Sequence, residues 1–226
     1  MHGALPACEI DVAFICEQSF IINMPRKKTI GDKTVLEAAA KVMFAEGPEF
    51  TLAKVAAAAG IAPATLLQRF GDKHRLVVAA IAHDNALFAE QLASLDRTKG
   101  ADAVIAVFRL LTPDDVAAER AGDGLLWLRQ DMRDPDLNAL ARERFAMLRA
   151  AVMVRLPPLP LDPAEAAQSV EAQWQGALLQ WGIAREGKLD AFVTRSLKNW
   201  FRLATGRRLR GVRRASRRRS RRATPA

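Results

Sequence analysis

Apolar residues recur every three or four positions along most of this chain, which is the spacing of the buried face of an α-helix. Between Lys33 and Glu46 the apolar positions follow this period, with Asp32 as a candidate cap and Gly47-Pro48 as a stop. No alternating β-branched run of strand length, bounded by turns, is found in the sequence. The pattern predicts an all-α fold.

Turn and capping residues divide the next segment into helices. Thr51 is expected to cap a short helix over Leu52–Ala59, and Gly60 supplies the left-handed residue that ends it. Pro63 has the fixed φ suited to the first turn of another helix, which runs to Phe70. A longer helix is predicted from Lys73 to about Ser94.

Five more helices fit between the turn signals that follow, so about nine are predicted in total. The breaks are expected near Lys99-Gly100, Thr112-Pro113, Asp134-Pro135, Leu156 to Pro163 and Glu186-Gly187. The predicted organisation is a disordered leader (1–24), an N-terminal helical domain (25–82), a larger helical domain (83–206) and a disordered Arg-rich tail (207–226).

The net charge of +9 is spread unevenly along the chain. Residues 207–226 contain ten arginines and no acid, so the rest of the chain is close to neutral. Within that body, residues 25–82 hold nine Lys or Arg against five acids. The local sign of the charge is therefore a better guide to nucleic-acid binding than the total.

Membrane and secretory classes are not supported. The longest charge-free run of the body, Val55–Gln68, contains Gly60 and Pro63 and falls short of the roughly 20 apolar residues that span a bilayer. The leader carries acids where a signal peptide needs a basic start, so a cytoplasmic location is expected. Both cysteines, Cys8 and Cys16, lie in this leader, so a disulfide between them would not constrain the main fold.

Thr51 to Phe70 meets the requirements of a helix-turn-helix. Small residues at Ala56 and Ala59 allow two helices to cross closely, Gly60 makes the turn, and apolar side chains fix the crossing angle. These apolar residues are Val55, Ile61, Leu66 and Phe70. An alanine-rich helical hairpin without a ligand would satisfy the same packing.

The wider context resembles the DNA-binding domain of the TetR family of transcriptional regulators. The likeness covers about Thr34 to Ile81 and rests on residues at matching spacing. They are Phe44-Ala45-Glu46-Gly47, Thr51, Val55-Ala56, Ala59-Gly60-Ile61, Thr65-Leu66, Phe70, Lys73 and Leu76. The resemblance implies an all-α homodimer that binds a palindromic operator in double-stranded DNA, most simply a repressor released by a small-molecule effector.

The same resemblance implies contacts with DNA. Thr51 and Lys73 correspond to positions that hold backbone phosphate, and Thr65 and Gln68 to the groove-facing side of the recognition helix. The basic segment that precedes the first helix is a candidate minor-groove arm, or simply an exposed basic start. It consists of Arg26, Lys27 and Lys28. Only Pro25 separates it from Met24, so Met24 is a candidate start of translation.

The chain also departs from the family pattern. Ala62, Leu67 and Arg69 stand where the family usually has a serine and two tyrosines, which leaves the DNA sequence that is read open. Arg69 is either a replacement contact or a solvated residue at the helix end. His74 and Arg75 make the start of the fourth helix more basic than is common there.

Large side chains of the second domain are the candidates for an effector pocket and a dimer interface. The pocket candidates are Phe108, Trp127, Met132, Phe145, Met147 and Trp174. The residue that would bind the polar part of the effector is one of Arg129, Gln130, Asn138 and Gln173, and helical spacing does not choose between them. The last two helices, about 163–186 and 189–205, are expected to dimerise through Trp174, Leu178, Trp181, Leu197, Trp200 and Phe201.

Two other classes of protein compete with this interpretation. A metalloprotein is not supported, because His2, His74 and His83 show no metal-ligand spacing with Cys or a second His. An enzyme is not supported either, because the sequence contains no glycine-rich phosphate loop and no serine elbow. No metal and no cofactor are therefore expected. The alternative is a sequence-independent nucleic-acid or polyanion binder, a helical dimer driven by the Arg-rich tail.

Overall fold

The computed structural model describes residues 30–112 and 121–205, and these ranges contain nine α-helices and no strand. The predicted all-α class is confirmed. The first four helices are α1 (Asp32–Glu46), α2 (Leu52–Ala59), α3 (Pro63–Phe70) and α4 (Lys73–Ser94), with a 3-10 turn at Gly47–Glu49. The others are α5 (Ala101–Arg109), α6 (Ala121–Arg133), α7 (Pro135–Met153), α8 (Pro163–Ala184) and α9 (Leu189–Ala204).

Local chemistry explains most of the helix boundaries. The side chains of Thr51, Asp72, Asp134 and Asp162 cap α2, α4, α7 and α8 by accepting hydrogen bonds from backbone N–H groups of the first turn. The predicted cap at Asp32 is wrong, because Asp32 is the first residue of α1 and the capping position belongs to Gly31, which has no side chain to accept a bond.

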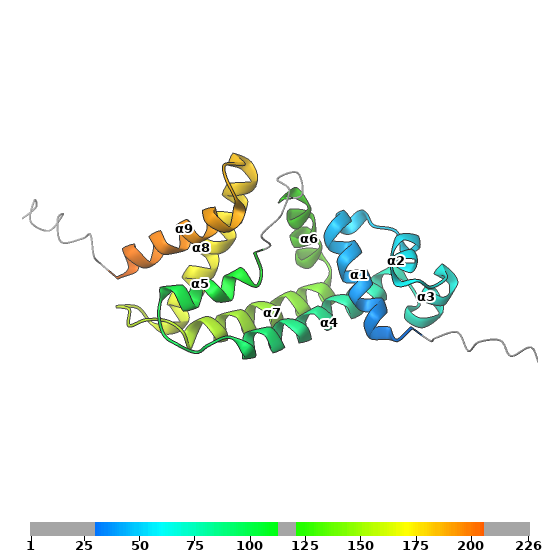
Figure 1. Cartoon of the computed structure of the whole chain (residues 1–226), viewed down its shortest axis with the longest axis horizontal. Helices are drawn as coiled ribbons and strands as arrows, with labels where there is room; N and C mark the ends of the chain where they lie inside the picture. The colour runs from blue at the N-terminus through cyan, green and yellow to red at the C-terminus, as the bar shows by residue number, and fades with distance from the viewer. Residues whose placement is uncertain (1–29, 113–120, 206–226) are drawn as a thin grey trace, which may run out of the picture.

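The helices enclose two hydrophobic cores, one near each end of the molecule (Figure 1). The first core lies among α1 to α4 and includes Val35, Val55 and Leu66. The second lies among α5, α7, α8 and α9 and includes Phe108, Leu148 and Leu197. The predicted boundary near residue 82 falls inside α4, because this helix contributes to both cores.

The long helices α4 and α7 lie side by side and connect the two ends (Figure 1). Leu76, Val77 and Ala80 of α4 belong to the first core, whereas Phe88 and Leu92 belong to the second. None of the helices in the described ranges combines the length and the apolar character needed to cross a membrane.

Ionic contacts inside the second half join neighbouring helices. Arg149 of α7 donates from Nη1 to Oε2 of Glu171 on α8 at 3.1 Å. The Glu171 side chain is only 9% exposed, and its burial raises the pKa of this carboxyl group although Arg149 lowers it. Arg155 is buried as well, and its guanidinium donates to the backbone carbonyls of Leu92, Leu95, Asp96 and Ala151.

Candidate DNA-binding interface

The turn between α2 and α3 is closed by backbone hydrogen bonds around Gly60. Its N–H donates to the carbonyl of Ala57 at 3.1 Å, and the N–H of Ile61 donates to the carbonyl of Ala56 at 3.0 Å. This pairing is a Schellman motif, which needs a residue in the left-handed region, and Gly60 has φ +68°. The predicted role of Gly60 as the turn residue is confirmed.

The second helix of the motif, α3, presents one face to solvent. Leu66 points into the first core and is 1% exposed. Gln68 is exposed and Thr65 is half-buried, while Leu67 is 43% exposed although it is a large apolar residue. A face with one amide, one hydroxyl and one isobutyl group can pair with adenine and contact the methyl group of thymine in a major groove.

Arg69 binds the start of α1. Its Nη1 donates to the carbonyl oxygen of Ile30 at 2.6 Å and to Oδ1 of Asp32 at 3.3 Å, and its side chain is 24% exposed. The sequence suggested either a DNA contact or a solvated end, and neither anticipated this bond between the first and third helices. A DNA contact through the other N–H groups of Arg69 stays a prediction.

Lys73, at the start of α4, also binds a backbone carbonyl oxygen near α1, as Arg69 does. Its Nζ donates to the carbonyl oxygen of Pro48 at 2.9 Å and lies 4.3 Å from the centroid of the Phe50 ring. The ammonium group therefore fixes the turn after α1 against α4, and the phosphate contact predicted for it is untested. Thr51 is exposed, and its Oγ1 accepts from the N–H of Lys54 at 3.4 Å. The basic segment Arg26–Lys28 lies outside the described residues.

The six candidate pocket residues do not line one cavity. Phe108 and Trp174 pack together in the second core with ring centroids 5.6 Å apart, and the indole N–H of Trp174 donates to Oγ1 of Thr112 at 2.9 Å. Trp127 instead packs against the first core and donates to the carbonyl of Met43. Met132 is 69% exposed, and Phe145 and Met147 lie at the edge of the second core.

A groove of about 340 Å³ lies between α4 and α7 and is open to solvent. Of the six candidates only Met147 lines it, together with Leu92, Val154, Arg97 and several alanines. Helical spacing could place each side chain on the inner face of its helix. It could not show which helix would lie opposite each side chain. For this reason it did not predict that Trp127 packs against the first core while Phe108 and Trp174 lie in the second.

The candidate dimer residues mostly fill the core between α8 and α9. Trp174, Trp181, Leu197 and Phe201 are buried within the chain, while Leu178 and Trp200 are half-buried. Other apolar side chains of these two helices face solvent. They are Leu179, Ile183 and Leu203, with exposures of 47%, 78% and 63%.

The geometry of α2, Gly60 and α3, attached to a larger helical body, defines a helix-turn-helix protein. Residues 35–80 match the family described as bacterial regulatory proteins, tetR family. The comparison with curated proteins gave no match.

Solved structures share the fold over most of the chain. A transcriptional regulator from Rhodococcus sp. Rha1 has a TM-score of 0.62 and 19% identity, covering 79% of this chain and 96% of that one. A tetR-family transcriptional regulator from Streptomyces coelicolor has a TM-score of 0.56 and 16% identity, with coverage of 75% and 80%. FadR from Bacillus subtilis, in complex with stearoyl-CoA, has a TM-score of 0.53 and 18% identity, with coverage of 78% and 99%.

These findings confirm the resemblance seen in the sequence. Residues 35–80 match the TetR family, and the chain as a whole shares the fold of these solved regulators.

Proposed function

We propose that this protein is a cytoplasmic homodimeric repressor that binds a palindromic operator and is released by a small-molecule effector. The observation that carries the proposal is the α2–Gly60–α3 motif, in which Leu66 is buried and the opposite face of α3 is exposed. A recognition helix needs this combination of a rigid support and a free outer face to enter a major groove.

Residues of this motif supply different kinds of DNA contact. Gln68 would pair with a base edge, and Leu67 would contact a thymine methyl group, because both are exposed on α3. Thr51 and Lys73 would approach phosphates, and the Arg26–Lys28 segment would follow the adjacent minor groove. Thr65 would lie on the same groove-facing side as Gln68, and Arg69 would flank it.

Dimerisation would use the solvent-facing side of α8 and α9. Leu179 and Ile183 of α8 are four residues apart, so they share one helix face. Leu203 of α9 is exposed as well, but it lies toward the start of α8, because Trp200 binds Ser169. These helices lie at the end of the molecule opposite α1 to α3 (Figure 1). Two copies joined there would leave both recognition helices free for half-sites about 34 Å apart.

The effector would act through α4. This helix begins next to the recognition helix and ends in the second core, where it borders the groove between α4 and α7. A ligand that moves α4 would change the separation of the two recognition helices. A coupling free energy of roughly 1–3 kcal/mol is typical of such switches.

Selection of bound sequences from a random DNA pool tests the proposal. A palindrome with two equal half-sites is the expected result, and a pool without enrichment would overturn it. Gln68→Ala should then weaken binding to the selected site by about 1–3 kcal/mol and relax the preference at one base pair. Gln91→Ala, an exposed glutamine near the far end of α4, is the matched control and should bind like the wild type.

The alternative function is that of a polyanion binder driven by the Arg-rich tail. Deletion of residues 207–226, which lie outside the described residues, distinguishes it from the specific regulator. A specific regulator should keep its operator preference with a shallower salt dependence. A tail-driven binder should lose most of its affinity for every sequence.

A further inference from the structure

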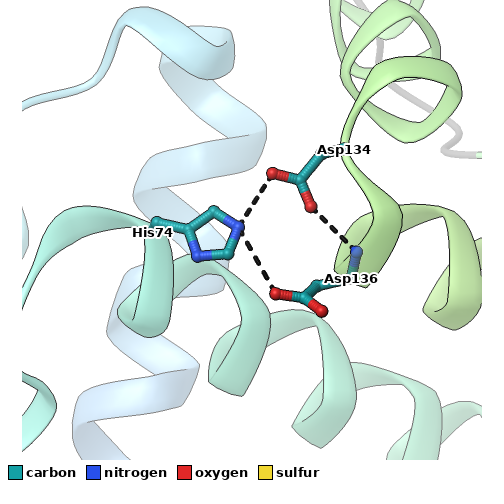
Figure 2. Close-up of side chains that lie close together, drawn as sticks. All are labelled: His74, Asp134 and Asp136. Carbon is teal, nitrogen blue, oxygen red and sulfur yellow. Dashed lines mark hydrogen bonds and ion pairs between the residues drawn. The ribbon is translucent and has the colours of Figure 1, made fainter.

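Three potential metal ligands from distant parts of the chain meet where α4 and α7 begin (Figure 2). His74 lies in the first turn of α4, Asp134 caps α7, and Asp136 lies in the first turn of α7. Nε2 of His74 is 2.8 Å from Oδ2 of Asp134 and 3.9 Å from Oδ2 of Asp136. One ligand atom from each residue lies within 4.8 Å of the other two.

The carboxylate of Asp134 is held in place by its own helix. Its Oδ1 accepts from the N–H of Asp136 at 3.0 Å and from the N–H of Leu137 at 3.1 Å. These bonds orient the carboxylate and leave Oδ2 directed at His74 (Figure 2). The bond from Leu137, together with His74, also lowers the pKa of Asp134, so the group is ionised at neutral pH.

We propose that His74, Asp134 and Asp136 bind a divalent transition-metal cation of the zinc type. In a tetrahedral zinc site with bonds of about 2.0–2.1 Å, neighbouring ligand atoms are about 3.3 Å apart. The observed separations of 2.8 and 3.9 Å lie on either side of this value. Small rotations of side chains suffice, because the side chains of His74 and Asp136 are 45% and 63% exposed.

The chemistry of the ligands favours a transition metal over calcium or magnesium. Imidazole nitrogen suits zinc, cobalt and nickel, whereas calcium takes six to eight oxygen ligands and magnesium prefers an octahedron of oxygens. One imidazole and two carboxylates leave a fourth position on the solvent side for water. Coordination through Nε2 of His74 would replace the hydrogen bond between this nitrogen and Oδ2 of Asp134.

The cation would link the DNA-binding end to the helical body. His74 follows the last residue of α3, Phe70, by four positions, while Asp134 and Asp136 belong to the junction of α6 and α7. A shared metal would hold the start of α4 against the start of α7. Any effect of the metal on operator affinity rests on the proposed function, but binding of the metal itself does not.

Titration of the EDTA-treated full-length protein with Zn²⁺ and Co²⁺ tests the site. We expect one cation per chain at this cluster, a visible Co²⁺ spectrum of a nitrogen- and oxygen-ligated ion, and a higher melting temperature. Asp136→Asn and His74→Gln should each weaken binding by about ten-fold or more. His83→Gln is the matched control on the same helix, because His83 lies outside the cluster and faces Glu37, whose Oε1 is 4.0 Å from Nε2.

Two results would overturn the proposal: no binding at micromolar metal, or binding that is equally tight in Asp136→Asn and His74→Gln, which would place the cation elsewhere. Asp136→Asn keeps the Asp134 cap, so a circular dichroism spectrum unchanged from the wild type separates lost ligation from misfolding. Metal titration needs no DNA and operator selection needs no metal, so the two proposals fail separately.

Discussion

Arg144 of α7 donates from Nε to Oδ1 of Asn85 on α4 at 2.7 Å, at the level of α4 where one hydrophobic core ends and the other begins. Asn85 is 2% exposed, and its amide also donates to the carbonyl of Leu140 at 3.0 Å. Arg144 forms an ion pair with Asp84 as well. The two long helices are therefore fixed in register by a polar contact placed between the cores.

Replacing Asn85 by alanine should lower the free energy of unfolding by about 1–3 kcal/mol, because Arg144 and the carbonyl of Leu140 lose a buried partner. Urea unfolding followed by circular dichroism measures the change. Asn199→Ala is the control, since Asn199 is exposed and its side chain accepts from the nearby Arg202. A loss at Asn85 no larger than at Asn199 would show that the contact contributes little.

Gly60→Ala should destabilise the helix-turn-helix by about 1–2 kcal/mol, because φ +68° is unfavourable for a residue with a Cβ. The space itself is adequate, as the nearest atom to an added Cβ is Cδ1 of Ile30 at 3.5 Å. Gly176→Ala in α8 is the contrasting variant. It meets nothing within 4 Å and should stabilise the chain by roughly 0.5–1 kcal/mol.

Glu171→Gln should leave stability at pH 7 unchanged or higher. Burial raises the pKa of Glu171 in the folded chain above its unfolded value, so its favourable contribution is complete below the unfolded pKa. This contribution is lost as pH rises through the folded pKa. The free energy of unfolding of the glutamine variant should therefore fall less than that of the wild type between about pH 4 and pH 7. Urea midpoints across this range measure it, and a large loss for Glu171→Gln at pH 7 would refute the argument.

Ile183→Lys should convert the proposed dimer to a monomer without unfolding it, because this side chain is 78% exposed in the single chain. Leu197→Ala should instead cost about 2–5 kcal/mol of folding stability, since Leu197 is fully buried between α8 and α9. Size-exclusion chromatography with light scattering, together with thermal melts, distinguishes the two effects. A wild-type monomer at micromolar concentration would contradict the palindrome mechanism.

The sequence was sufficient for the helices and for the recognition motif. Capping residues such as Thr51, the turn at Gly60 and the proline at position 63 act within a few positions along the chain, so their effect can be read locally. Trp181 and Leu197 were predicted to lie in a dimer interface, whereas the structure buries them in the core of the single chain. Their partner could not be known, because periodicity shows which side of a helix is buried and not what covers it.

The contacts that the sequence did not reveal join residues far apart in the chain. Arg69 reaches Ile30 across 39 positions, and His74 reaches Asp134 across 60. Asp134-Pro135 was visible as a turn signal, and Asp136 carried no signal of its own. Only the packing of α4 against α7 brings a histidine to them.

The passage of α4 through both cores has a consequence for cooperativity. Leu76 of α4 belongs to the first core and Phe88 of the same helix to the second. Unfolding of α4 at either end would therefore also remove apolar contacts from the core at the other end. Heating should therefore produce one calorimetric transition for the whole body. A ligand that binds only the second core would also protect the amide hydrogens of the DNA-binding helices from exchange with solvent.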